Sequence, residues 1–209
     1  MLTNLIKKIF QNKINLVNID QVIDYIDKNS SFVSQVTLYP YLKTRAGTQH
    51  PKLFENEKFL SSLRISRWYI YISCVNDMSI FISSICAKDH NYTNKIAYKL
   101  AKYLSSMIFK KIKQNDIDDS EFHLSVKNIS KIYKGLILNQ IIKRDVLFKK
   151  SADDLIKWAP VSEQFKKEDE TILRNSINFR WIPIRKEVHQ NIDTNEINKQ
   201  WEILNKDYS

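Results

Sequence analysis

The sequence predicts an all-α protein, a single-domain bundle of several helices around one long buried helix. Only two glycines and four prolines occur in 209 residues, and a large β-sandwich or barrel needs many more turn residues than that. Hydrophobic residues make up 43% of the chain and charged residues 27%, which is typical of a folded globular protein. We therefore expect one helical domain over residues 1–209.

The predicted central helix spans residues 57–88. This segment contains neither glycine nor proline, and its apolar residues recur at the three- and four-residue steps of one helical face. The residues of that face are Phe59, Leu60, Leu63, Trp68, Tyr71, Ile72, Val75, Met78, Ile82 and Ile85. Further apolar residues at positions 65, 70, 80 and 81 leave little polar surface, which predicts burial on most sides of the helix.

The same segment is the candidate for a membrane span, because its apolar window has the length of about 20 residues that a bilayer requires. Asn76 and Asp77 lie at its centre, and an aspartate there costs roughly 2.5–3.5 kcal/mol on insertion scales. We therefore expect a core helix that is not transmembrane. A buried carboxylate needs a partner or a raised pKa. Asp77 is thus expected either to hydrogen-bond to the cap of a neighbouring helix or to an arginine, or to contact a ligand or act as a general base.

Before the central helix the pattern predicts helices at 3–16, about 20–28 and 32–42. Asn29-Ser30-Ser31 indicates a turn, and Pro40 is expected to bend or break the third helix. Gly47 is expected to end it with a positive φ, and Pro51 to delay the next helix. Residues 1–28 are expected as amphipathic helices at the periphery of the domain, and binding of the cationic segment 1–16 to a membrane surface is one alternative for its role.

Beyond the central helix we expect a hinge at 89–92, an antiparallel helix at 93–113, a break at 116–119 and a helix at 122–135. Residues 136–148 are expected to form a further helix, with a strand as the alternative. A short helix at 151–158 and a long helix at 161–181 follow. Pro160 fits the first turn of this long helix, and Pro183 is expected to end it. Residues 190–209 form a polar tail helix with a docking stripe of Ile197, Trp201 and Leu204.

The net charge is +10 and the pI about 9.4, which would normally favour an anionic partner. Seven of the 33 basic residues are arginines, so 33 − 7 = 26 are lysines. An excess of lysine, isoleucine and asparagine is typical of an AT-rich genome, so the charge alone is weak support for nucleic-acid binding. A row of lysines at 95, 99, 102, 110 and 113 keeps a nucleic-acid or ribosome-associated role as an alternative.

Motifs for catalysis, cofactors and metals are absent from the sequence. It has no glycine-rich phosphate loop, no H-E-x-x-H and no G-x-S-x-G, so we expect no cofactor, no metal and no catalytic residues. Cys74 and Cys86 are twelve residues apart in the central helix, where they cannot pair with each other. Two buried free thiols favour a reducing, cytoplasmic location.

The arginines are the strongest candidates for a site, because in a lysine-rich chain an arginine often stands where a planar, multi-donor cation is needed. Either they converge on a carboxylate, a phosphate or an acidic partner segment, or they pair with acidic residues and lock helices together. A pocket bounded by positions 45, 64, 67, 68 and 77 would favour a small-molecule binder or an enzyme. The candidate residues are Arg45, His50, Arg64, Arg67, Trp68, Arg174, Arg180 and Arg185.

Two segments, SFVSQVTLYPYLKTRAGTQHPKLFENEKFLSSLRISRWYIY and WAPVSEQFKKEDETILRNSINFRWIPIR, resemble a helical family of alphaproteobacterial proteins without an assigned function. The similarity covers residues 31–88 and 151–186. It implies a bacterial cytoplasmic protein and brings no catalytic residues with it.

The function that we expect is that of a non-enzymatic helical interaction module, such as an assembly factor, an adaptor or a chaperone-like protein, with a protein as its partner. This expectation depends on the all-helical pattern and on the missing catalytic motifs. The alternatives are a nucleic-acid or ribosome-associated protein and a small-molecule or anion-binding protein with an arginine-lined pocket.

Overall fold

The computed structural model describes residues 14–111, 138 and 147–207. Over these residues the protein is all-α, as predicted, and its one β contact is an isolated bridge between Leu16 and Ile192. Its elements are α2 (Ile19–Ala46), the 3-10 helix η1 (Gly47–Gln49), α3 (His50–Leu53), α4 (Glu57–Asp89), α5 (Asn94–Lys111), α8 (Lys149–Trp158), α9 (Glu163–Asn191) and α10 (Thr194–Asp207).

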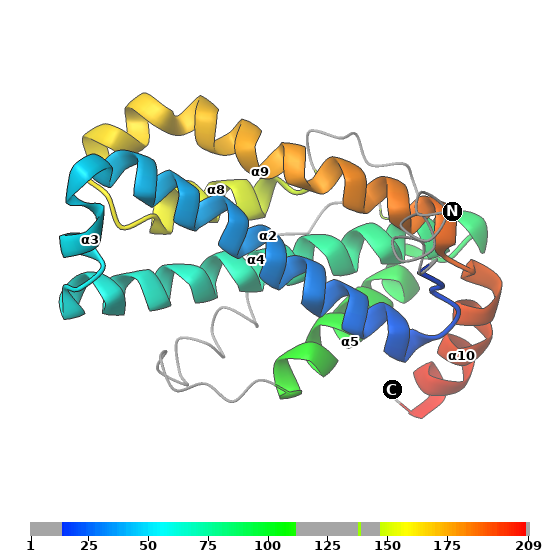
Figure 1. Ribbon diagram of the computed structural model, residues 1–209. Helices are drawn as coiled ribbons and strands as arrows, with labels where there is room; N and C mark the ends of the chain where they lie inside the picture. The colour runs from blue at the N-terminus through cyan, green and yellow to red at the C-terminus, as the bar shows by residue number, and fades with distance from the viewer. Residues whose placement is uncertain (1–13, 112–137, 139–146, 208–209) are drawn as a thin grey trace, which may run out of the picture.

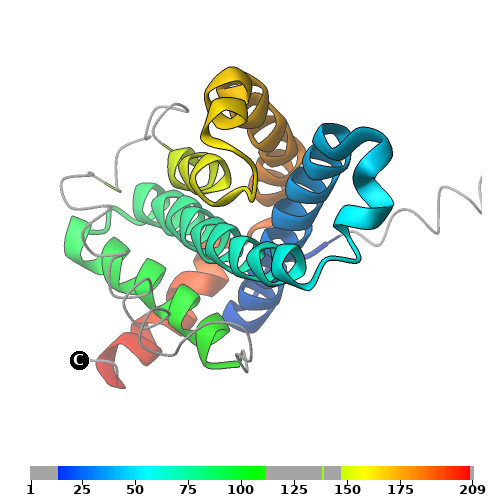
Figure 2. The same cartoon turned by 90° about the vertical axis from the view of Figure 1, so that its left-hand side faces the viewer.

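Helix α4 is the buried centre of the bundle, which confirms the prediction for 57–88. It packs against α2, α5 and α8, and Figure 2 shows it in the middle with these helices around it. Every side chain from Ile70 to Ser83 is buried. Such a run covers all faces of a helix, so α4 needs neighbours on every side.

Helices α5 and α10 close one end of the bundle. The predicted hinge is confirmed, because α4 ends at Asp89 and α5 begins at Asn94. Helix α5 then turns back along α4 (Figure 1). The predicted docking of the tail is also confirmed, since Ile197 and Trp201 of α10 are each 1% exposed and the ring of Trp201 lies 5.5 Å from that of Tyr103 in α5.

The prediction of a turn at Asn29-Ser30-Ser31 is wrong, because α2 runs without interruption from Ile19 to Ala46. Two of the three polar side chains find partners inside the helix. Asn29 donates to the Tyr25 carbonyl at 2.9 Å, and the Ser31 hydroxyl accepts from the Gln35 side-chain amide at 2.9 Å, while the buried Ser30 hydroxyl has no partner among the described residues. A polar residue whose hydrogen bonds return to its own helix does not end it.

The prolines end fewer helices than predicted. Pro40 lies within α2, and Pro183 lies within α9. Both prolines are solvent-exposed, and on the solvent side of a helix water can replace the donor that the carbonyl four residues earlier loses. The buried stripe of α9 therefore continues past Pro183 to Ile184 and Val188. Pro160 precedes α9, whose N-cap is Ser162.

The connection between α2 and α4 is built on Gly47. This glycine caps α2 with φ 52° and ψ −130°, as the sequence predicts for a positive-φ position. Pro51 does not delay the next helix, because it occupies the first turn of α3 and a helical N-terminus needs no proline N–H. Asn56 then caps α4 by accepting from the Phe59 backbone N–H at 3.1 Å.

Residues 14–17 are not helical, and Leu16 forms the isolated bridge with Ile192, which corrects the end of the helix predicted at 3–16. The Leu16 N–H donates to the Asn191 carbonyl and the Asp193 N–H donates to the Leu16 carbonyl, both at 3.0 Å. The rest of that predicted helix lies outside the described residues, and so do nearly all of the elements predicted between 113 and 148. Residues 19–28 belong to α2 and contribute Val22, Ile23 and Ile26 to the core.

Within the described ranges, α4 is the one helix long and apolar enough to cross a membrane, by length and composition alone. Ninety-four per cent of its most apolar window is buried inside the structure. Burial of this kind is also found for core helices, and the expectation that α4 is not transmembrane stays a prediction.

Replacement of Gly47 by alanine is expected to lower the free energy of unfolding by about 1–2 kcal/mol, because a Cβ disfavours positive φ. No atom lies within 4 Å of the position that this Cβ would take, so the cost is conformational and not a clash. Urea denaturation measures it. Thr48→Ala, at the exposed neighbouring position, is the control that should be close to neutral, and equal stability of the two variants would contradict the argument.

Candidate functional site

Helix α8 takes its caps from α4. Its own N-cap residue, Phe148, makes no side-chain cap, and the backbone N–H of Ser151 in its first turn donates instead to Oδ2 of Asp77 at 2.8 Å. At the other end, the Ser66 hydroxyl donates to the Trp158 carbonyl at 2.5 Å. The first N–H groups and the last carbonyls of a helix, such as those of Ser151 and Trp158, have no partner within the helix itself. A carboxylate is also favoured at a helix N-terminus, where the helix dipole is positive. Asp77 thus makes the helix-cap contact that the sequence offers as one of its two roles.

Phe148 anchors the start of α8 in the core. It is a non-glycine residue with φ 65°, a conformation that persists only where the surroundings hold it. Its side chain is 2% exposed, and its ring lies 4.7 Å from Trp181 and 5.6 Å from Phe81. The Trp181 indole N–H donates to the Ser151 hydroxyl at 3.3 Å, so one cluster joins α4, α8 and α9.

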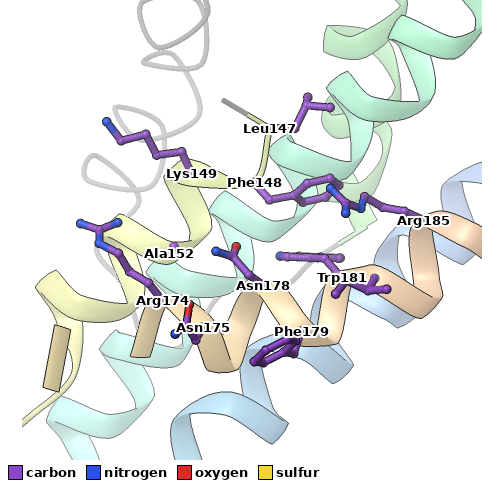
Figure 3. Close-up of a pocket in the computed structure, with 11 residues that line it drawn as sticks. Leu147, Phe148, Lys149, Ala152, Arg174, Asn175, Asn178, Phe179, Trp181 and Arg185 are labelled. Atoms are coloured by element: carbon purple, nitrogen blue, oxygen red, sulfur yellow. The ribbon is translucent and has the colours of Figure 1, made fainter. Parts of the chain in front are cut away.

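A hollow of about 460 Å³ lies over this cluster between α8 and α9. Figure 3 shows Arg174 and Lys149 at one end of it, Arg185 at the other, and Phe148 with Trp181 between them. The α9 residues at 174, 178, 181 and 185 line the same hollow, because steps of four, three and four residues stay on one helical face.

A second hollow, of about 660 Å³, continues along α9 toward the C-terminal end of α4. It shares Leu147, Ile182 and Arg185 with the first, so the two hollows adjoin along α9, and we name them together the α9 groove. Ile182 is 50% exposed, and Ile85 and Leu147 are partly exposed. The groove thus presents aliphatic side chains to solvent.

The rim of the α9 groove is basic. Among the described residues its charged side chains are five cations and one carboxylate, namely Lys88, Lys149, Arg174, Arg185, Lys186 and Asp89. His189 also lines it, with its ring edge-on to Phe81 at 5.3 Å. Burial lowers the pKa of His189, and the nearby Lys88 and Arg185 lower it further, so this imidazole is predominantly neutral at pH 7.

The three C-terminal arginine candidates do not form one cluster. Arg174 and Arg185 are eleven residues apart, on one face, and both line the α9 groove. Arg180 instead borders a hollow on the α2 side of α9, beside Thr44 and Ile172. Arg174 is also held in place, because it pairs with Asp153 at 2.6 Å and with Glu170 at 2.8 Å.

Arg45 locks α2 to α9. Its guanidinium makes a two-point ion pair with Asp169, whose side chain is 5% exposed. The Tyr41 hydroxyl donates to the same carboxylate at 3.0 Å, and the Arg45 Cζ lies 4.6 Å from the Phe165 ring centroid. The hydrogen bonds from Arg45 lower the pKa of Asp169, while burial opposes that shift. Arg45 therefore has the structural role that the sequence offers as an alternative.

The remaining candidates on α3 and α4 do not converge with Arg45. The His50 ring lies 4.7 Å from that of Phe54, and Arg64 is exposed. Arg67 and Trp68 line a small hollow of about 260 Å³ against α2, on a side of α4 away from Asp77, which faces α8. These side chains therefore do not meet in one cavity, as the alternative of a small-molecule binder or enzyme would require.

The buried amide Asn76 stands apart from these contacts. It is 3% exposed, and its Oδ1 has no hydrogen-bond partner within the described part of the chain. The predicted row of lysines lies along α5 at 95, 99, 102 and 110, while position 113 falls outside the described ranges. Neither feature borders the α9 groove.

Sequence reasoning missed most of the α9 groove, namely Lys88, Leu147, Phe148, Lys149, Asn178, Ile182, Lys186 and His189. One signal was available, because Arg174, Asn178, Trp181 and Arg185 follow the spacing of one helical face. The contributions of α4 and of residues 147–149 carried no such signal, since they reach the groove only through tertiary packing.

The described residues contain no cluster suited to binding a metal and no reactive cysteine. No group of three or more His, Cys, Asp or Glu side chains there has the geometry of a metal site. Cys74 and Cys86 are free and buried. Burial raises the pKa of Cys86 to about 12 and that of Cys74 well above its usual range, so both thiols are inert at neutral pH.

Comparison with known proteins gives no relative. No protein-family model matches the chain, and no curated protein and no solved structure is similar to it. The resemblance to an alphaproteobacterial family stays a prediction, as do the bacterial origin and the cytoplasmic location.

Replacement of Asp77 by alanine is expected to lower the free energy of unfolding by about 2–3 kcal/mol, because the buried Ser151 N–H loses its acceptor. Asp77→Asn keeps an amide oxygen in that place and should cost about 1 kcal/mol or less. Chemical denaturation of the two variants gives the comparison. Equal losses in both variants would show that the contact with α8 is not what Asp77 contributes.

The Arg45–Asp169 pair is expected to make part of the stability depend on pH. Because the pKa of Asp169 is lowered in the folded state, its contribution is present above the unfolded-state pKa of about 3.9 and is lost as the pH falls through the folded-state value. The difference in melting temperature between wild type and Asp169→Asn should thus be constant near neutral pH and shrink below about pH 4. A difference that persists unchanged in acid would contradict this assignment.

Proposed function

We propose that this protein is a helical protein-interaction module that binds its partner in the α9 groove. The observation that carries the proposal is the group of solvent-accessible aliphatic side chains in a concave surface, where the half-exposed Ile182 lines the same hollow as Leu147 and Ile85. Apolar side chains gathered in a rimmed depression are typical of binding surfaces.

The shape of the groove favours a polypeptide over a small molecule. Its lining extends from Arg174 on α9 to Ile192, the residue that follows the helix, a separation of 18 positions and thus roughly 27 Å at 1.5 Å per residue. A drug-sized ligand is usually enclosed by one compact pocket, whereas a long open groove fits a segment of a partner chain.

The floor of the groove is also suited to a stable interface. Phe148 and Trp181 are almost fully buried beneath it, and the Ser151 junction ties them to α4 and α8. A rigid surface loses little conformational entropy when a partner binds, and this favours affinity.

The proposal is tested by a photo-cross-linking amino acid placed at Ile182 of the full chain, in cells of the source organism. A discrete adduct with another protein is expected, because the side chain projects into the groove. Ile203, which is 65% exposed on α10 and outside the groove, is the matched control and should not give that adduct. Adding Ile85→Glu on the opposite wall should abolish the adduct at 182.

Two results would overturn the proposal. If position 182 cross-links within the same chain, a segment of this protein occupies the groove and no partner binds there. The same set of adducts from positions 182 and 203 would show that contact is not specific to the groove.

A further inference from the structure

We infer that the α9 groove takes an acidic amphipathic helix of the partner, with carboxylates over its basic ends and apolar side chains over Leu147 and Ile182. The inference rests on the proposed function and adds the chemistry of the occupant.

The charges at the two ends of the groove call for carboxylates. Lys149 at one end and Lys88 and Lys186 at the other pair with no carboxylate of the described residues, and all three are exposed. Asp89, the one acidic side chain in the described lining, already accepts from the Thr194 hydroxyl at 3.0 Å. A complementary partner therefore supplies negative charge at both ends.

The surroundings of His189 are consistent with this positive potential. Lys88 and Asp89 face it from α4, and Arg185 and Lys186 line the groove beside it on α9. Lys88 and Arg185 both lower the pKa of His189 and so disfavour the imidazolium, while Asp89 opposes them. An acidic partner would relieve that repulsion, so the pKa of His189 is expected to rise on binding.

The walls of the groove favour a helix over an extended strand. They are formed by α4, α8 and α9, whose backbone groups are already paired within the helices. A bound strand needs an open sheet edge for its own backbone, whereas a helix satisfies its backbone internally and contributes only side chains. The groove length of roughly 27 Å corresponds to about 18 helical residues.

The aromatic residues of the groove do not form a stacking surface for nucleic acid. Successive bases stack on a series of accessible rings, but Phe148 is 2% and Trp181 1% exposed, which leaves Phe179, at 66%, as the accessible Phe or Trp ring of the described lining. The other accessible apolar side chains of the groove are aliphatic, namely Leu147, Ile182 and Ile85, and such side chains pack against those of another protein.

The test uses the full chain and fluorescein-labelled helical peptides of about 18 residues, with leucines on one face and glutamates at both ends. A control peptide carries glutamine in place of each glutamate. Fluorescence anisotropy is expected to show about tenfold tighter binding of the glutamate peptide, as two or three partly exposed ion pairs would give. The preference should shrink between about 50 mM and 300 mM salt.

Matched charge reversals locate the binding. The double variant Lys88→Glu, Lys186→Glu should lose the preference for the glutamate peptide. Lys95→Glu, Lys102→Glu carries the same change in net charge on exposed positions of α5, outside the groove, and should keep it.

Three results would overturn the inference. These are equal affinity for both peptides or no binding at about millimolar peptide, equal losses in the two double variants, and displacement of the peptide by an oligouridylate RNA. If one of these results were found together with a cross-linked partner at position 182, the inference would fail and the proposed function would hold. If no partner cross-linked at position 182, the proposed function itself would fail.

Discussion

The arrangement of the bundle depends on how α4 accommodates its buried polar side chains. Ser66, Ser73 and Asp77 lie on one face of α4, and they bind the Trp158 carbonyl, the Asp154 carboxylate and the Ser151 N–H of α8. The order is antiparallel, with steps of seven and four residues on α4 against four and three on α8. Leaving these groups unpaired in the core would cost several kcal/mol in all. One register of α8 on α4 is therefore strongly favoured.

That register also determines the groove. Because Asp77 holds the first turn of α8, Phe148 and Lys149 are fixed relative to α4, and the Ser151 hydroxyl is placed to accept from Trp181 of α9. The α9 groove is thus bounded by three helices that meet at one hydrogen-bonded junction. The same contacts that stabilise the fold position the surface that we propose for binding.

The roles of the arginines and lysines differ from those that the sequence predicts, where the arginines are the candidates for a binding site. Arg45 and Arg174 each pair with acidic side chains of the bundle, where a planar guanidinium can bind two oxygens at once. The lysines at 88, 149 and 186 are the cations that remain open to solvent along the groove. Arg45 and Arg174 thus stabilise helix contacts, whereas these three lysines contribute point charges to the surface that we propose for binding.

The sequence by itself determined the helical class, the central helix 57–88, the hinge before Asn94, the cap at Gly47 and the docking stripe of α10. Each follows from local spacing or from a backbone conformation that one residue type prefers. Tertiary structure decided whether α2 and α9 continue through Pro40 and Pro183, because a proline is tolerated in a helix where the freed carbonyl faces water. It also decided the site. Residues 85–89, 147–149 and 174–192 meet only when α8 and α9 pack on α4, and no local pattern encodes a contact between segments so far apart in the chain.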